Sequence, residues 1–186
     1  MLIGITGTLG AGKGSVVDYL VRTKGFRHVS ARSIWAKELE ARNIIVNRNN
    51  MVTLANQLRA EHGADYFMRL ALETVLDKTE KVVIESVRTV AEAELLKARK
   101  GYLLAVNADI ALRYKRIGGR GSVLDNVTFE EFIQQEQNEM MNEDPNKQNI
   151  AKVIDLADYK IINNGTLEEL EFEINLFLAS IRKLSI

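Results

Sequence analysis

The sequence predicts a three-layer α/β fold, in which a five-stranded parallel sheet is flanked by helices, and three observations support this. Five short apolar runs are spaced along the chain, helix-like stretches separate them, and a glycine-rich loop follows the first run. Strands that alternate with helices form βαβ units, whose parallel sheet is covered by helices on both faces. Such sheets bind ligands at the carboxyl ends of their strands, so we expect the functional site there.

The apolar runs are short enough to be buried strands. They span residues 2–5, 26–29, 82–84, 102–106 and 159–162. Three helices between or after them are predicted to begin with a capping box, in which a threonine covers a free backbone N–H and a glutamate three residues later bonds back. The pairs are Thr89 with Glu92, Thr128 with Glu131, and Thr166 with Glu169. Residues 31–76 are too long for one crossover helix, so we expect a helical insertion that binds the acceptor substrate.

Composition indicates an ordinary globular protein, and we expect one domain over residues 1–186. The chain is 46% hydrophobic and 27% charged, and its 25 basic residues balance its 25 acidic ones. No overall field therefore favours nucleic acid or an anionic membrane, and we expect neither as a partner. The absence of cysteine excludes a disulfide framework. With no signal peptide pattern and no apolar run near the ~18 residues of a membrane helix, we expect a cytoplasmic monomer or homodimer.

The glycine-rich loop lies directly after the first strand and before a helical pattern, and it reads Gly7-Thr-Leu-Gly10-Ala-Gly12-Lys13-Gly14-Ser15. This is the GxxxxGK pattern of a phosphate-binding loop: glycines let backbone N–H groups face inward, and the lysine reaches the β and γ phosphates of ATP. A dinucleotide-binding loop is the alternative, but its third glycine is displaced here. The residues predicted to bind ATP are Gly7, Gly10, Ala11, Gly12, Lys13, Gly14 and Ser15, with the Ser15 hydroxyl on the Mg²⁺ side.

The Gly-Lys-Gly-Ser of residues 12–15 resembles the Gly-Lys-Gly-Thr of adenylate kinase and other nucleoside monophosphate kinases. Other phosphate-binding loops carry Ser or Thr directly after the lysine, where this chain has Gly14. Leu9 stands where adenylate kinases usually have proline. The resemblance implies a P-loop kinase fold that transfers a phosphoryl group from ATP to a small phosphorylated acceptor, with Lys13 as a catalytic residue.

The third strand ends in Glu85, which is typical of a Walker B element. A carboxylate there holds Mg²⁺ through water or orients the acceptor, and Arg88 follows it to meet a phosphate. A strand that ends in a charged residue of no catalytic role is the alternative for Glu85. The run from Glu85 to Arg88 is similar to the acidic residue, two spacers and arginine of deoxynucleoside monophosphate kinases and of a dephospho-coenzyme A kinase-like group.

Further acceptor-binding residues are implied by the same resemblance. In nucleotide kinases, arginines after the second strand and in the helical insertion clamp the acceptor phosphate, and aromatic and acidic groups contact its base or sugar. The corresponding residues are Arg32, Arg59, Asp65 and Tyr66. A solvated surface residue or a helix cap is the alternative for each. We expect core positions for Trp35, Phe67 and Met68, and structural roles for His28 and His62, which lack metal-ligand spacing.

A short lid is predicted over residues 113–127, after the fourth strand. Arg113 and Arg116 lie three apart on a predicted helix and so share a face, and Arg120 follows on a glycine-rich turn. Phosphoryl transfer needs positive charge around the moving phosphoryl oxygens and exclusion of water, which three mobile arginines supply. A solvated basic helix end is the alternative. Dephospho-coenzyme A kinases and nucleoside monophosphate kinases similarly place arginines on this helix.

The last strand leads into Asn163-Asn164-Gly165-Thr166, which is similar to a turn beside the adenine of ATP in dephospho-coenzyme A kinases. The resemblance implies that Asn164 and Gly165 contact ATP. We favour a nucleoside or deoxynucleoside monophosphate as acceptor over dephospho-coenzyme A, because no aspartate-rich stretch follows the second strand. A nucleotide-binding switch or a regulatory ATPase is the alternative from another class.

Overall fold

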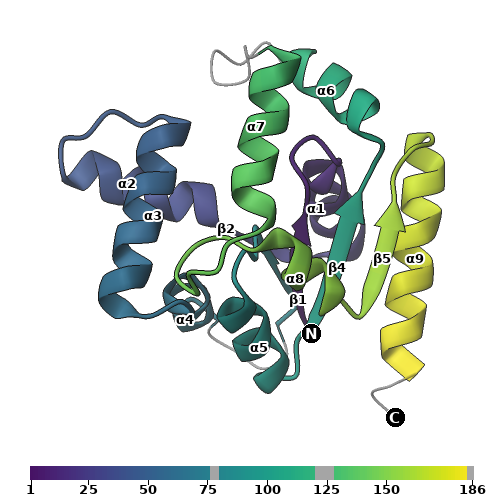
Figure 1. Ribbon diagram of the computed structural model, residues 1–186. Helices are drawn as coiled ribbons and strands as arrows, with labels where there is room; N and C mark the ends of the chain where they lie inside the picture. Colours follow the sequence, from purple (N-terminus) through teal and green to yellow (C-terminus); the bar gives the residue numbers. More distant parts are fainter. Residues whose placement is uncertain (76–79, 120–127, 184–186) are drawn as a thin grey trace.

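The computed structural model describes residues 1–75, 80–119 and 128–183 (Figure 1). At its centre is a sheet with the strand order β2-β3-β1-β4-β5, and every pair of neighbouring strands is parallel. The strands are β1 (Leu2–Gly7), β2 (Arg27–Ser30), β3 (Val82–Glu85), β4 (Tyr102–Asn107) and β5 (Tyr159–Ile162). The predicted five-stranded parallel sheet is therefore confirmed.

Helices cover both faces of this sheet, as the βαβ pattern predicts. α1 (Lys13–Lys24) and α9 (Leu167–Lys183) pack on one face. The other face packs against α2 (Ala31–Ala41), α3 (Arg48–His62), α4 (Tyr66–Glu73), α5 (Val90–Ala98) and α8 (Ile150–Asp155). α6 (Ile110–Gly118) and α7 (Phe129–Met140) follow β4, and α7 lies near the carboxyl ends of the strands, between α3 and the loop before α1 (Figure 1).

Alternation along the strands builds the two cores. Successive side chains of a strand point to opposite faces, so Leu103 packs into the α2–α5 layer while Leu104 packs into the layer of α1 and α9. Val82 and Val83 divide in the same way, and all four side chains are fully buried. Burial on both faces explains why these strands appear in the sequence as continuous apolar runs.

The stretch between β2 and β3 forms three helices, α2, α3 and α4. Trp35 and Phe67 join this insertion to the core with ring centroids 5.9 Å apart, and Met68 is fully buried beside them. The core positions predicted for these three residues are confirmed. Thr89 and Thr128 each begin a helix with the predicted capping box. The box of Thr166 and Glu169 is also formed, with hydrogen bonds of 2.8 and 3.2 Å.

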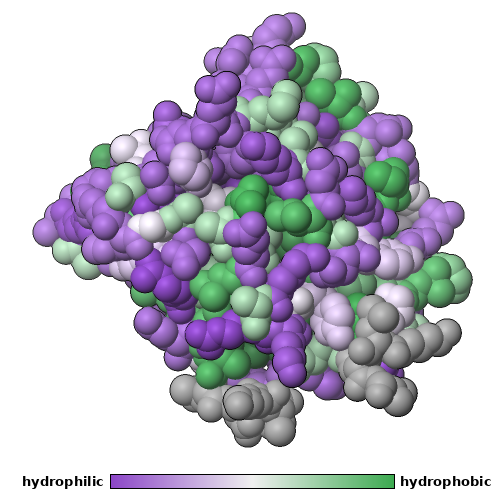
Figure 2. All heavy atoms as spheres, turned by 60° about the horizontal axis from the view of Figure 1, so that its bottom comes forward, coloured by the Kyte–Doolittle hydropathy of each residue, from purple (hydrophilic) through white to green (hydrophobic). Residues whose placement is uncertain are grey.

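The surface near the amino ends of the strands is mainly hydrophilic. Figure 2 shows hydrophobic residues on this face as separate patches among charged and polar ones. Among the described residues, none of the helices combines the length and apolar character needed to cross a membrane.

Candidate active site

The loop between β1 and α1 has a backbone that requires glycine. Gly7 and Gly12 adopt φ values of 133° and 95°, which side-chain-bearing residues rarely tolerate. A Cβ on Gly12 would lie 2.2 Å from Nδ2 of Asn163, and one on Gly7 would lie 1.9 Å from the carbonyl oxygen of Val106. The glycine pattern is therefore fixed by backbone conformation and by close packing against β4 and the turn after β5.

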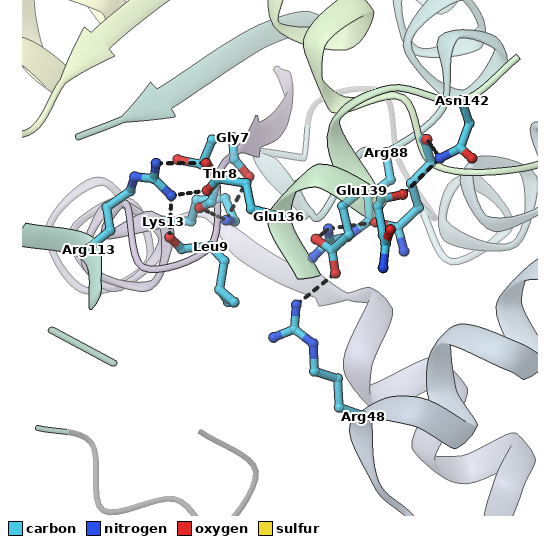
Figure 3. Close-up of polar contacts among 12 residues, drawn as sticks. Gly7, Thr8, Leu9, Lys13, Arg48, Arg88, Arg113, Glu136, Glu139 and Asn142 are labelled. Atoms are coloured by element: carbon cyan, nitrogen blue, oxygen red, sulfur yellow. Dashed lines mark hydrogen bonds and ion pairs between the residues drawn. The ribbon is translucent and has the colours of Figure 1, made fainter. Parts of the chain in front are cut away.

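Lys13 begins α1 and folds back over this loop. Its Nζ donates to the carbonyl oxygens of Gly7 at 2.9 Å and Thr8 at 2.7 Å (Figure 3). The ammonium thus lies inside the curl of the loop, beside the amino end of a helix, where partial positive charge favours an anion. Ser15 is exposed on the first turn of α1 and lines the same cavity as Lys13.

Arg113 of α6 supports the loop through hydrogen bonds. Its guanidinium donates to the carbonyl oxygens of Ala108 at 2.7 Å and Leu9 at 3.2 Å, and it forms an ion pair with Glu136 of α7. Arg113 is only 5% exposed, and the Glu136 carboxylate offsets the free-energy cost of burying its charge. The structure therefore holds Arg113 in place, whereas the sequence suggested an arginine on a mobile lid. Its catalytic role stays a prediction.

Arg116 lies one turn after Arg113 and donates to the carbonyl oxygen of Asn163 at 2.8 Å. Arg120 and the rest of the predicted lid beyond residue 119 lie outside the described residues. Arg116 lines a cavity of about 320 Å³ together with Ser15, Asn163 and Gly165. This cavity adjoins the phosphate loop at the place where the resemblance puts the adenine of ATP.

The turn after β5 contacts the loop through a residue that the sequence reasoning missed. Nδ2 of Asn163 donates to the carbonyl oxygen of Ala11 at 2.8 Å, and Asn163 is buried. Its neighbour Asn164, the predicted ATP contact, instead accepts a hydrogen bond from the backbone N–H of Asp109 at 2.9 Å. The sequence does not show which of two adjacent asparagines in a turn points toward the loop, so the contact of Asn163 could not be predicted from it.

The main cavity has a volume of about 570 Å³ and extends from the phosphate loop to a group of basic side chains. Its wall near the loop includes residues 9–15, and Glu85 and Ser86 line it at the end of β3. The basic residues that line it are Arg32, Arg48, Arg59 and Arg88. An apolar part of the lining, the apolar wall, is formed by Trp35, Met51, Val52 and Ala55. The glycine-rich loop and the group of arginines therefore share one cavity.

Glu85 lines this cavity at the carboxyl end of β3, which runs between β1 and β2. The register pairs Glu85 with Ile5 on one side and with Ser30 on the other. Its carboxylate lies 3.2 Å from Nε2 of His28. Burial works to raise the pKa of Glu85, but the hydrogen bond and charge of His28, with Lys13 and Arg88, outweigh it and hold the pKa below its ordinary value. Glu85 is therefore a carboxylate at neutral pH.

The backbone turns sharply directly after Glu85. Ser86 has a φ of 74°, and the N–H groups of Ser86 and Val87 both donate to the carbonyl oxygen of Ile5 at 3.0 Å. A positive φ at a residue with a side chain costs free energy and is common at functional sites. Ser86 lines the cavity, and no sequence signal pointed to it.

Arg59 is almost fully buried, and it lines the cavity together with the other three arginines. Its Nε and Nη2 contact Glu92 at 3.0 and 2.9 Å, while its Nη1 has no hydrogen-bond partner in the described part of the chain. Arg88 and Arg48 share a second carboxylate, Glu139. Arg32 is exposed at the start of α2.

Asp65 and Tyr66, also predicted to bind the acceptor, do not line this cavity. Asp65 forms an ion pair with Arg69 at 3.1 Å, and Tyr66 lies against His62 with ring centroids 4.6 Å apart. Conversely, the cavity includes Arg48, Trp35 and Glu139, to which the sequence reasoning assigned no such role.

Known proteins resemble this chain in sequence or in fold. A family model described as an AAA domain matches residues 3–142. A UPF0200 protein of Hyperthermus butylicus is 33% identical, over 93% of this chain and 90% of its own length. Shikimate kinase from Bacteroides thetaiotaomicron aligns over 98% of both chains with a TM-score of 0.61 and 16% identity. A gluconokinase from Sinorhizobium meliloti aligns over 98% of this chain and 91% of its own, with a TM-score of 0.56 and 13% identity.

The likeness to the two kinases shows a shared fold, so the P-loop kinase fold predicted from residues 7–15 is confirmed. On the match to the family model and the identity to its relative, the chain belongs to the AAA domain family and to the family of UPF0200 proteins.

Proposed function

We propose that this protein transfers the γ-phosphoryl group of ATP to a small phosphorylated acceptor, a nucleoside or deoxynucleoside monophosphate. The observation that carries the proposal is the single cavity that joins the phosphate loop to four arginines. A phosphoryl donor and a phosphorylated acceptor each need positive charge, and the transferred group must pass between them without contact with bulk water. One cavity with a basic group at each end meets both needs.

Each end has its own role in this proposal. Lys13 and the loop N–H groups hold the donor phosphates, while Arg32, Arg59 and Arg88 hold the acceptor phosphate. Arg113 acts through the loop, since it supports Leu9, and Arg116 with Arg120 adds positive charge near the transferred group. These residues act by placement and charge, as is usual in phosphoryl transfer.

The Ser15 hydroxyl and the ionised Glu85 carboxylate are oxygen ligands of the kind that Mg²⁺ prefers. Ser15 lines the cavity at the helix start, and Glu85 lines it at the end of β3, so the residues fit a magnesium–ATP complex. Bound there, the ion would neutralise charge on the donor phosphates. Glu85 would also orient the acceptor.

The apolar wall favours an acceptor with a flat ring. Trp35, Met51 and Ala55 line the same cavity as the charged residues, and a nucleobase can pack against them. Dephospho-coenzyme A is the alternative acceptor, and a nucleotide-binding switch or regulatory ATPase is the alternative from another class. The fold neighbours shikimate kinase and gluconokinase add shikimate and gluconate to the compounds worth testing.

The deciding experiment is a coupled assay of ADP release with magnesium and ATP. Each ribo- and deoxynucleoside monophosphate, dephospho-coenzyme A, shikimate and gluconate is supplied in turn, and Lys13→Ala serves as the matched control. We expect release that depends on one monophosphate and is lost in the variant. Slow release that no acceptor stimulates would support a switch or regulatory ATPase, and release with shikimate or gluconate alone would refute a phosphorylated acceptor.

A further inference from the structure

The acceptor end of the cavity already contains a carboxylate. Glu139 of α7 lies between two arginines: its Oε1 accepts from Nη2 of Arg48 at 2.7 Å, and its Oε2 accepts from Nη1 of Arg88 at 2.8 Å (Figure 3). The arginines come from α3 and from the connection between β3 and α5, so three separate elements meet at this point. All three side chains line the cavity.

The arrangement is that of a bound anion. Proteins often hold phosphate in this way, with two guanidinium groups that each donate to a different oxygen of the anion. Glu139 is ionised here: burial works to raise its pKa, but the charges and hydrogen bonds of Arg88 and Arg48 bring the pKa below its ordinary value. Arg88 is further fixed by a hydrogen bond of 2.8 Å from the same Nη1 to Oε1 of Gln148.

A phosphate group would bring more negative charge and more acceptor oxygens to this site than Glu139 does. The carboxylate brings one negative charge and two oxygens, whereas a phosphomonoester at neutral pH brings nearly two charges and three oxygens. Arg59, whose buried Nη1 has no hydrogen-bond partner in the described part of the chain, lines the same cavity and adds a third guanidinium charge that favours the more highly charged anion. Exchange of Glu139 for a phosphate is therefore favourable, while exchange for a second carboxylate gains little.

We propose that Glu139 is an internal competitor of the acceptor: it occupies Arg48 and Arg88 until a phosphate displaces it, and it thereby sets the affinity and charge selectivity of the acceptor end. The inference rests on the proposed function, because that proposal places the acceptor phosphate at Arg88, and it adds Arg48 to the residues that bind it. Glu139 acts through the two arginines and is a positioning residue. Its removal should strengthen phosphate binding, whereas removal of an ordinary structural ion pair would leave phosphate binding unchanged or weaker.

The test uses Glu139→Gln, which keeps the shape of the side chain and removes its charge. Binding of inorganic phosphate to the full-length chain is measured by titration calorimetry at fixed ionic strength. We expect at least about a tenfold tighter dissociation constant in the variant, as follows when a charge-assisted hydrogen-bonded competitor is removed. Glu130→Gln is the matched control, because Glu130 is exposed on the first turn of the same helix and its loss should change nothing.

A second variant assigns the effect to the arginine pair, since phosphate can also bind the loop around Lys13. In Glu139→Gln combined with Arg48→Ala, the gain in phosphate affinity should disappear. A gain that survives loss of Arg48, or no gain in the single variant, overturns the proposal. This readout needs no ATP and no turnover, so it stands apart from a failure to find kinase activity. If the acceptor assay succeeds, Glu139→Gln should also lower KM for the acceptor more than it changes kcat.

Discussion

The donor and acceptor ends of the cavity are built in different ways. The donor end is one contiguous loop, residues 7–15, whose shape depends on backbone φ values and on carbonyl groups that Lys13 and Arg113 contact. The acceptor end consists of side chains from α2, α3 and the β3–α5 connection, balanced by carboxylates on α5 and α7. The donor end is shaped mainly by local backbone conformation, whereas the acceptor end is held together by ion pairs between separate elements.

The difference shows that residues at the acceptor end contribute both to the proposed binding and to the stability of the fold. Lys13 can be lost from the donor end without leaving a buried charge, whereas the acceptor arginines and their carboxylates are part of the packed structure. Helix α7 contacts both ends, since Glu136 pairs with the arginine that supports the loop and Glu139 pairs with the acceptor arginines (Figure 3). Loss of a carboxylate that pairs with the buried acceptor arginines should therefore affect folding, whereas loss of Lys13 from the donor end should affect turnover with little effect on folding.

The largest effect is expected from Glu92→Ala. Glu92 is fully buried, and its two oxygens accept from Arg59 and from the backbone N–H of Arg88. Its loss leaves the Arg59 guanidinium buried without a counter-charge, which costs about 3–5 kcal/mol of the free energy of unfolding. Chemical denaturation of the variant and the wild type measures this difference.

An exposed ion pair supplies the control for that measurement. Glu38 and Arg42 lie one turn apart on α2, 2.8 Å from each other, with side chains 42% and 37% exposed. Glu38→Ala should therefore change stability by less than about 0.5 kcal/mol. If Glu92→Ala were as mild as Glu38→Ala, the acceptor end would not be part of the folded framework, and the contrast with the donor end would fail.

Lys13→Ala should show the opposite behaviour. Removal of a charge that stabilises the transferred phosphoryl group costs about 2–3 kcal/mol of transition-state stabilisation, a rate drop of about a hundredfold. The free energy of unfolding should stay within about 1 kcal/mol of the wild type, because Lys13 is only half-buried and its truncation leaves no buried charge without a partner. Turnover is measured by ADP release and stability by denaturation. Unchanged turnover would remove Lys13 from the proposed chemistry.

The same contrast explains what the sequence could predict. The five strands, the capping boxes and the phosphate loop all follow from residues that are close in the sequence, and the structure contains each of them. Apolar runs mark buried strands, and glycines mark the turns that need positive φ. Arg32, Arg59 and Arg88 were also predicted for the acceptor side, and all three line the cavity.

What the sequence could not predict depends on contacts between distant elements. Arg48 and Glu139 meet only because the fold brings α7 close to the first residue of α3, and neither belongs to a local motif. Asp65 and Tyr66 were placed by resemblance, yet they pair with neighbours on α3 and α4 outside the cavity. Burial of Arg113 likewise depends on Glu136, which comes from a helix beyond residues 120–127.

The smallest expected effect is on the pH dependence of stability. Two carboxylates that line the cavity, Glu85 and Glu139, have lowered pKa values, and only Glu139 is paired with the acceptor arginines Arg48 and Arg88. A carboxyl whose pKa is lower in the folded state than in the unfolded chain adds stability above the unfolded value, near 4.5, and this contribution is lost as pH falls through the folded value. Wild-type stability should therefore decrease below about pH 4.5, since the unfolded chain then binds more protons.

Glu139→Gln removes one of these two contributions and so tests whether the acceptor end carries it. The stability advantage of the wild type over this variant should be largest at neutral pH. It should shrink as pH falls below about 4.5, where the carboxyl of residue 139 is protonated in the unfolded chain, and be lost as pH falls through the lower pKa of Glu139 in the folded state. Denaturation curves from pH 7 to about pH 3 measure the trend, with Glu130→Gln as the control that keeps the wild-type slope. A difference that stays constant over this range would mean that Glu139 contributes packing rather than charge. The arginine pair would then hold no anion for a phosphate to displace.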